Sequence, residues 1–511
     1  MKLRSSGTAF KLFTLILILL TQFLYGCTGS GEKTDMSNLP KLINVSSSAN
    51  INFGEIAALG QIATFGDINN DNYIDFVAGN ARSRPENTFL YLNNKDNTFL
   101  NVTTNSGLIK TRNRSATLAD YNNDGLLDLL IGTIQVSSPP VLYKNMGDLQ
   151  FAYVSREAGL TAKLGSTFQA MWLDYNNDGF VDILQVNVGG KIVPQHLYHN
   201  NGNGTFTLVS ESVGLTESFS AHTGVAIDYD NDGDSDIFYG VSGGINVLYR
   251  NNNGTFENVT ESAGLQGDPE WDTVGACAGD INGDGFMDIY IVNISSVRNA
   301  LYKNNGDGTF SDITEASSTQ DVGDGRTCAF VDFNSDGKVD IYSSNHINPS
   351  KLFVNIGQDK FKEVAEEVGI VNPRDIFSAS WGDYNMDGYI DLLANGHLGG
   401  GLYKNSGNGN NNIVVNLIGN GTTTNTSAIG SKVTVTTKLG SQYKTVSGGK
   451  GCCEQDMLPL HFGLKKETEA DIVVSWTDGT ECQAKKLAIE GSSYITVNQQ
   501  GCDIKSSKIG N

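Results

Sequence analysis

Short apolar runs bounded by glycine, asparagine and serine recur along most of the chain. A run such as 236–238 (Asp-Ile-Phe) precedes a polar connection, a Leu-Tyr-x-Asn segment, a second turn and a Val-Thr segment that ends in Gly-Leu. Extended runs rich in β-branched and aromatic residues, bounded by turn residues, are typical of strands. Four such segments in each unit predict one four-stranded blade of a β-propeller per unit.

A nine-residue motif, D-x-[DN]-x-D-[GN]-x-x-D, marks each unit and recurs every 51 to 54 residues. It begins at Asp67, Asp120, Asp174, Asp228, Asp280, Asp332 and Asp383. Seven units within residues 41–410 predict an all-β fold with one closed seven-bladed β-propeller. We expect residues 41–53, which resemble the last part of a unit, to supply the strand that closes the ring.

The residue four positions before each motif is small, as expected where innermost strands crowd around one axis. These residues are Ala63, Ala116, Ala170, Gly224, Ala276, Cys328 and Ala379.

The motif has the donors of a calcium loop: side-chain oxygens at positions 1, 3, 5 and 9 and a backbone carbonyl at position 7. Position 6 is glycine in six copies and Asn72 in the first, because a sharp turn there needs a positive φ. The alternative, a polar hairpin turn, does not require three carboxylates to lie together, where they repel one another.

The motif therefore predicts up to seven Ca²⁺ ions. Their predicted ligands are Asp67, Asn69, Asp71, Tyr73 and Asp75; Asp120, Asn122, Asp124, Leu126 and Asp128; Asp174, Asn176, Asp178, Phe180 and Asp182; Asp228, Asp230, Asp232, Asp234 and Asp236; Asp280, Asn282, Asp284, Phe286 and Asp288; Asp332, Asn334, Asp336, Lys338 and Asp340; and Asp383, Asn385, Asp387, Tyr389 and Asp391.

The loops also account for much of the acidity of the chain. They supply 23 of its 56 Asp and Glu residues, and the formal net charge is −21. An acidic surface without a basic face excludes nucleic acid as a partner.

Residues 1–26 have the pattern of an export signal: Lys2, Arg4 and Lys11 precede the apolar run 12–20. The segment ends in Leu-Tyr-Gly-Cys, which resembles a bacterial lipobox and implies a lipid on Cys27. Residues 27–40 then form a polar tether. We expect an exported lipoprotein of the outer membrane or cell surface, which meets the membrane through this lipid. The alternative is an ordinary secretory signal cut near Gly26.

The units at 41–410 resemble the FG-GAP/VCBS repeats of integrin α-subunit propellers and of exported bacterial proteins, and this resemblance implies calcium at the same loops. Residues 411–498 alternate like strands and predict a small β-rich domain. The stretches 428–433, 460–464 and 476–479 look like the UnbV/ASPIC domain, which places the chain in the cartilage acidic protein-like family. Residues 499–511 are expected to be a tail.

The cysteines beyond Cys27 fall into two groups. Cys277 and Cys328 lie at or near the small inner position, so we expect buried free thiols. Cys452, Cys453, Cys482 and Cys502 can form disulfides in an exported protein. The three possible pairings stay open.

The sequence contains no H-E-x-x-H, G-x-S-x-G or phosphate-binding motif. His222 lies near Asp228, and we explain it by its loop and not by a catalytic triad. We interpret His461 as a structural residue. We therefore expect a binding or adhesion module for a protein or glycan, not an enzyme. The alternatives are a polysaccharide-active propeller, either lyase or hydrolase, and a purely structural surface component. A cluster of His, Tyr, Arg and carboxylates on one face would favour the enzyme.

The segments that lead into the innermost strands lie on the face opposite the calcium loops and differ from unit to unit. They carry the candidate ligand-binding residues Arg112, Arg114, Trp271, Arg326 and Arg374. Arg and Trp are over-represented among residues that dominate binding, so we expect an anionic or glycan partner near the axis of this face. The alternative is that these are variable loops without a ligand.

Overall fold

The computed structural model describes residues 36–53, 60–80, 88–108, 113–135, 138–161, 165–189, 193–370, 375–396 and 400–508. The strands of these residues form nine four-stranded sheets. Helices are short: η1 (Met36–Asn38), η2 (Thr103–Asn105), α3 (Thr260–Ala263), α4 (Thr314–Ser317), α5 (Ala365–Val368) and η3 (Gln500–Cys502). Within this described part, none is long and apolar enough to cross a membrane.

Seven of the sheets are blades, and in six of them four consecutive strands run outward in chain order. The first three blades are β2 (Gly60–Gly66), β3 (Asp75–Asn80), β4 (Thr88–Asn93) and β5 (Phe99–Asn101); β6 (Asn113–Ala119), β7 (Asp128–Thr133), β8 (Val141–Asn145) and β9 (Phe151–Tyr153); and β10 (Ser166–Leu173), β11 (Asp182–Val188), β12 (His196–Asn200) and β13 (Phe206–Leu208).

The next three blades are β14 (Ala221–Ile227), β15 (Asp236–Val241), β16 (Val247–Asn252) and β17 (Thr255–Asn258); β18 (Thr273–Gly279), β19 (Asp288–Asn293), β20 (Ala300–Asn304) and β21 (Phe310–Asp312); and β22 (Gly325–Val331), β23 (Asp340–Asn345), β24 (Lys351–Gly357) and β25 (Lys360–Glu363).

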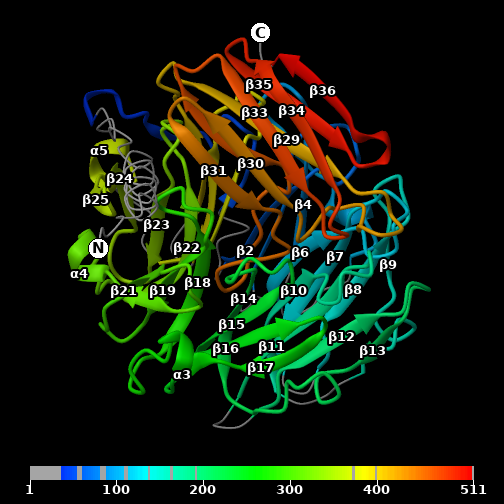
Figure 1. Cartoon of the computed structure of the whole chain (residues 1–511). Helices are drawn as coiled ribbons and strands as arrows, with labels where there is room; N and C mark the ends of the chain where they lie inside the picture. Colours follow the sequence, from blue (N-terminus) through cyan, green and yellow to red (C-terminus); the bar gives the residue numbers. More distant parts are fainter. Residues whose placement is uncertain are drawn as a thin grey trace, which may run out of the picture.

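The last blade joins the two ends of the propeller. It contains β26 (Ile376–Gly382), β27 (Asp391–Gly396), β28 (Gly401–Asn405) and, outermost, β1 (Leu42–Asn44). β1 pairs antiparallel with β28, with Leu42 opposite Asn405. Each innermost strand contacts the next, and β26 contacts β2, so the ring is closed. The predicted all-β propeller fold is confirmed, and the N-terminal strand closes it as expected (Figure 1).

Two further sheets form the C-terminal domain. One has the order β32 (Leu460–Lys465), β29 (Asn411–Ile418), β35 (Ser492–Asn498), β36 (Asp503–Lys508), and the other β31 (Gly440–Thr445), β30 (Lys432–Thr437), β33 (Glu469–Ser475), β34 (Glu481–Ala488). Part of the expected tail is therefore a strand, because β36 pairs with β35. These strands lie across one side of the ring (Figure 1).

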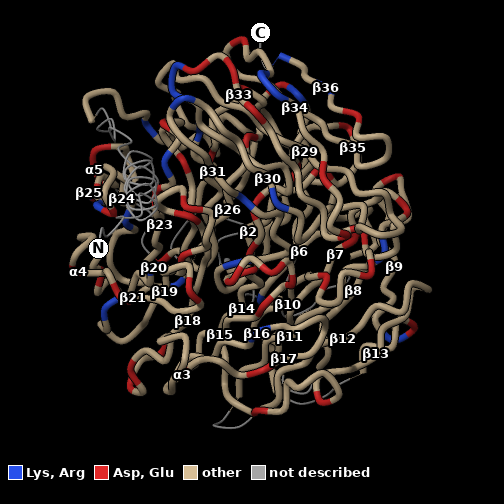
Figure 2. Tube along the Cα trace, in the orientation of Figure 1, with Lys and Arg blue, Asp and Glu red and all other residues tan. Residues whose placement is uncertain are grey.

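The propeller and the C-terminal domain are joined by a common hydrophobic core. One cluster of buried side chains includes Trp172 and Tyr121 of the propeller together with Ile413 and Phe462 of the C-terminal domain. Trp172 is fully buried. The full sequence has 56 Asp and Glu residues against 35 Lys and Arg residues, and Figure 2 shows acidic positions spread over the propeller.

Candidate functional site

The fourth loop shows the predicted convergence of carboxylates most clearly. Oxygens of Asp228, Asp230 and Asp236 lie within 4.8 Å of one another, the one such group of three His, Cys, Asp or Glu residues among the described residues. Burial raises the pKa of Asp236 to about 8. Burial also raises the pKa of Asp228 to about 6, with repulsion from Asp232 and Asp230 adding to the effect. These carboxylates are costly to ionise together unless a cation lies among them.

The backbone of all seven loops follows one path. Position 6 has φ between 68° and 91° in every copy, Asn72 included, as the sequence predicted. Position 4 has φ between 53° and 73° as well, even where it is Ser335 or Met386. Sequence reasoning missed this second left-handed residue, although asparagine in four copies and Gly283 in a fifth favour a positive φ there.

The other six loops have asparagine at position 3. It contacts the aspartate at position 5 in several of them, for example Asn69 Nδ2 to Asp71 Oδ2 at 3.0 Å. The position 1 aspartate accepts the backbone N–H groups of positions 5 and 6, as Asp67 does from Asp71 and Asn72. The side chains at positions 1, 3 and 5, which the motif predicts as metal ligands, therefore lie together.

The position 9 aspartates have a structural role that the sequence did not reveal. Asp236 is buried, and its two oxygens accept backbone N–H groups of Tyr229 and Asn251 at 3.1 and 2.7 Å. Asn251 is the asparagine of a Leu-Tyr-x-Asn segment. Its Nδ2 donates to Ser235 O in its own blade and to Tyr175 O in the preceding blade.

This link between blades repeats around the whole ring. The donors to the preceding blade are Asn93, Asn145, Asn200, Asn251, Asn304, Asn355 and Asn405. The Asn93 bond to Tyr384 O crosses the point where the ring closes.

The C-terminal domain covers the face that carries the loops. Thr426 Oγ1 donates to Asp120 Oδ2 at 2.6 Å, Lys432 Nζ to Asn231 Oδ1 at 2.6 Å, and Lys465 N to Ser335 O at 3.0 Å. His461, interpreted as structural from sequence, is buried with Nε2 3.0 Å from Gly388 O. Burial lowers its pKa to about 3.

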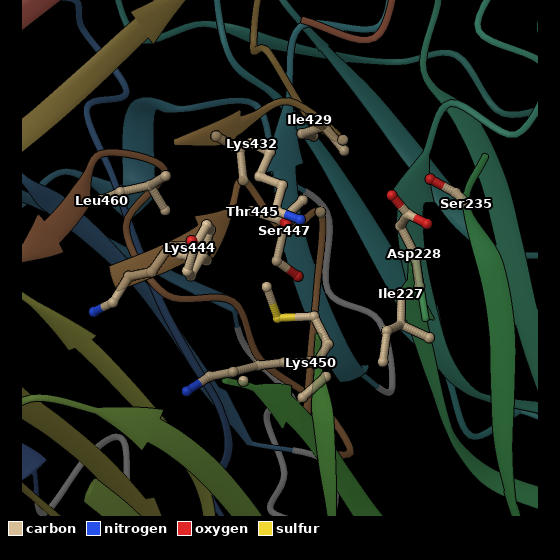
Figure 3. Close-up of a pocket in the computed structure, with 18 of the residues that line it drawn as sticks. Ile227, Asp228, Ser235, Ile429, Lys432, Lys444, Thr445, Ser447, Lys450 and Leu460 are labelled. Carbon is tan, nitrogen blue, oxygen red and sulfur yellow. The ribbon is translucent and has the colours of Figure 1, made fainter. Parts of the chain in front are cut away.

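A cavity of about 530 Å³ lies between the two domains. Asp228 borders it from the propeller, while Lys432, Lys444 and Lys450 border it from the C-terminal domain (Figure 3). Burial lowers the pKa of both Lys432 and Lys444. The attraction of Asp228 favours the charged form of Lys432, so this lysine offsets part of the negative charge of the fourth loop.

A hairpin of the C-terminal domain, residues 446–457, fills the axis of the ring; we call it the plug. Trp172 and Gly448 form a β-bridge, and a Cβ on Gly448 would lie 2.1 Å from Trp172 O, so only glycine allows this approach. Further along, the plug bonds Ala276 O through Gly451 N and Ala116 N through Cys453 O. The small residues four positions before each loop therefore also make room for this hairpin.

The cysteines pair in a way that corrects one prediction. Cys277 and Cys328 form a disulfide and are not free thiols. They lie on the adjacent innermost strands β18 and β22, with Cα atoms 5.8 Å apart, which suits a disulfide. Cys482 pairs with Cys502, and Cys452 pairs with its neighbour Cys453 at the tip of the plug.

Every innermost strand contains a β-bulge six positions before its acidic loop. The bulged residues are Gln61, Arg114, Phe168, His222, Val274, Arg326 and Phe377. A bulge leaves its residue out of the ladder and redirects its side chain. Six of these residues, all but Gln61, line one pocket with Cys452, Ile294 and His346, and we call it the bulge pocket. The sequence carries a signal for this site: the residue six positions before each loop differs from unit to unit, whereas the residue four positions before each loop is always small.

Charged groups surround the bulge pocket. His222 Nδ1 lies 3.5 Å from Asp272 Oδ1 of the next blade, so its interpretation through its own loop was wrong. His346 lies between Asp324 and Asp375, at 3.2 and 3.0 Å.

Of the residues predicted to bind a ligand, Arg114 and Arg326 meet in the bulge pocket. Trp271 does not line it; the ring is half-buried, with the Arg298 guanidinium 5.2 Å from its centroid. Arg112 and Arg374 lie outside the described residues, as does Cys27.

Two family models match the chain. The FG-GAP-like repeat model matches residues 67–131, 174–239, 228–291, 280–343 and 332–394, more than half of the chain, and each match starts at the first aspartate of a loop. The ASPIC and UnbV model matches residues 421–502 in the C-terminal domain.

Two curated relatives are similar to parts of the chain. Cartilage acidic protein 1 of Mus musculus is 23% identical over 368 residues, covering 69% of this chain and 48% of the relative. Cartilage acidic protein 1 of Homo sapiens is 30% identical over 290 residues, covering 44% and 43%. The chain thus spans less than half the length of these relatives.

Solved structures similar to this chain include the exotype rhamnogalacturonan lyase YesX, at 15% identity and a TM-score of 0.38, covering 65% of this chain and 60% of that one. BBS1N in complex with ARL6DN matches at 11% identity and a TM-score of 0.44, covering 69% and 93%.

Proposed function

Because this chain belongs to the FG-GAP-like repeat family, we propose that it is a calcium-loaded binding module and not an enzyme. The convergence of Asp228, Asp230 and Asp236 on one point carries the calcium part of the proposal. Oxygen ligands alone, many of them carboxylates, suit a hard cation, and the flexible geometry of such loops suits Ca²⁺ better than Mg²⁺. The ligands would be the thirty-five positions named from the motif.

Calcium would have a structural role in this arrangement. The ions would neutralise buried carboxylates whose pKa burial now raises, such as Asp128 and Asp288, each to about 8. The C-terminal domain rests on the same loops, through Thr426 on Asp120 and Lys465 on Ser335. Filling the loops would therefore also fix the surface that holds the two domains together.

Chelation tests this part directly. A ligand that binds only the native state stabilises it by mass action, and extracellular calcium modules bind at about 10⁻⁴ to 10⁻³ M. We expect excess chelator to lower Tm substantially and calcium in that range to restore it. Asp232→Ala should remove one ion by elemental analysis. Asp234→Ala is the matched control, since position 7 contributes only its carbonyl, and it should keep all ions. An unchanged Tm in chelator, or a full ion count in Asp232→Ala, would refute the calcium site.

The proposal includes export and a lipid anchor on Cys27, at the outer membrane or cell surface. The basic start, apolar run and lipobox-like end of residues 1–27 support it. Cys27→Ser should move the protein from the detergent fraction to the soluble exported fraction, because the anchored residue is lost. Unaltered partitioning would favour an ordinary secretory signal.

The partner would be a protein or glycan that docks on the side of the bulge pocket. Support comes from the opposite face, where the C-terminal domain already contacts the loops of several blades. The soluble mature chain on glycan and protein arrays, with and without Ca²⁺, tests the proposal. Binding that requires Ca²⁺ and is lost in chelator is expected; absence of any ligand would argue for a purely structural component.

One observation favours a second function, a polysaccharide-active enzyme. The pairs His222–Asp272 and His346–Asp375 lie beside Arg326, and such groups can hold or move protons. The described lining of the bulge pocket contains no tyrosine. Incubation with acidic glycans, scored for unsaturated or reducing ends, separates the two functions, since a binding module releases neither.

A further inference from the structure

We propose that the bulge pocket is a binding site for a carboxylate carried on a small ring, such as the uronic acid at the end of an acidic glycan. The proposal rests on the function above, because it names the chemistry that a binding module of this kind would recognise. Its evidence is independent of calcium: the seven bulges, the plug and the charges around the pocket.

The fold builds this pocket from one register of the repeat. Six of the seven bulged side chains come together in this pocket at the start of the innermost strands. The plug closes the axis from the other side, and Cys452 at its tip forms the floor. Residues in equivalent places thus differ in chemistry around one centre, which is the arrangement that discriminates a ligand.

Among the described residues, the ionisable side chains that line the pocket are all basic: Arg114, His222, Arg326 and His346. The carboxylates of Asp272, Asp324 and Asp375 contact these groups but do not line the pocket. These carboxylates fix the orientation of the basic groups. The pocket itself presents hydrogen-bond donors, and such a lining favours an anion as the ligand.

The two arginines are held in fixed planes. The Arg114 guanidinium lies 3.8 Å from the ring centroid of Phe168, and that of Arg326 lies 4.9 Å from Phe377. A guanidinium held on a ring face keeps its N–H donors along its edges, where they match the two oxygens of a carboxylate. Arg326 Nε is buried and has no hydrogen-bond partner among the described residues, so one donor of this group is left for a ligand.

The rest of the lining defines the size and polarity of the ligand. Val274, Ile294 and the disulfide sulfur of Cys452 give an apolar side to a pocket of about 290 Å³. Ligand pockets span roughly 300–1,000 Å³, so this one suits one ring rather than a length of polymer. A carboxylate alone would leave the apolar side without contact, whereas a ring that carries a carboxylate satisfies both sides.

Calorimetry on the calcium-loaded mature chain tests the site with glucuronate, galacturonate, glucose, benzoate and acetate. We expect a uronate, benzoate or both to bind at least about tenfold more tightly than glucose and acetate, since one charged hydrogen-bonded contact contributes about 1.5–3 kcal/mol. The uronates and benzoate distinguish a sugar ring from an aromatic ring. Equal binding of acetate, or of glucose, would overturn the assignment.

Variants locate the site. Arg114→Gln and Arg326→Gln should each weaken binding about 10- to 100-fold, and Arg326→Lys should do nearly as much, because lysine keeps the charge but loses the planar fork. Arg298→Gln is the matched control: its guanidinium lies over Trp271, outside the pocket, and binding should not change. Unchanged affinity in both Arg→Gln variants would overturn the proposal.

Calcium content and Tm are measured on every sample, which separates the two proposals. Loss of ring-carboxylate binding with normal calcium content and Tm would refute this inference alone. A chain that holds no calcium and still binds the uronate or benzoate would refute the proposed calcium loading alone.

Discussion

The asparagine that links each blade to the one before it can be tested at Asn251. This residue is fully buried, and its side chain makes three hydrogen bonds: to Tyr175 O at 2.7 Å, to Ser235 O at 3.0 Å and from Gly254 N at 2.8 Å. Asn251→Ala removes all three and leaves two carbonyls and one N–H without their partner. A hydrogen bond contributes about 0.5–1.5 kcal/mol net, and a buried group left unpaired costs more. We therefore expect a loss of about 3 kcal/mol in the free energy of unfolding.

Urea unfolding in saturating calcium, followed by tryptophan fluorescence, measures this loss. Asn252→Ala is the matched control, since the neighbouring side chain is exposed, and its effect should stay within about 0.5 kcal/mol. Asn251→Asp should be at least as damaging as alanine, because it turns carboxylate oxygens toward two carbonyls beside Asp236. An Asn251→Ala variant with the same free energy of unfolding as the Asn252→Ala control would show that the link does not stabilise the fold.

Two further predictions concern the plug and the disulfides. Burial raises the pKa of Glu454 from 4.5 to about 8, so the folded protein holds this proton more tightly than the unfolded chain, and the free energy of unfolding should fall as pH rises from about 4.5 to 8. In calcium, Glu454→Gln should flatten that slope by up to about 1.4 kcal/mol per pH unit. Parallel stability curves for the variant and the original chain would contradict this prediction. Thiol labelling of the denatured, unreduced Cys27→Ser chain should detect no free cysteine, because the other six are paired; two labelled thiols at Cys277 and Cys328 would restore the sequence-based expectation.

Features that repeat along the chain were predictable from the sequence, because seven copies reinforce one signal. The blade count follows from the period, and the left-handed residue at position 6 follows from glycine in six copies and Asn72 in the first. The closing strand β1 was recognisable because residues 41–53 look like part of a unit.

Contacts between units were not predictable in the same way. Cys277 and Cys328 are 51 residues apart, about one repeat, and only the side-by-side arrangement of β18 and β22 makes them a pair. The plug was hidden because residues 446–457 show neither the repeat nor a strand pattern, and their partners lie in distant blades. His222 was misjudged because its contact, Asp272, belongs to the next unit.

The plug also changes what counts as an independent part of this molecule. Groups such as Leu118 N and Trp381 N find their partners in Gln455 and Asp456, and Ala276 O finds its partner in Gly451. A ring cut off before the plug would lose these partners, and side chains such as Trp172, which pack in one apolar cluster with the C-terminal domain, would be exposed to water. Propeller and C-terminal domain are therefore one cooperative folding unit, and neither can be exchanged between relatives as a separate module without the other.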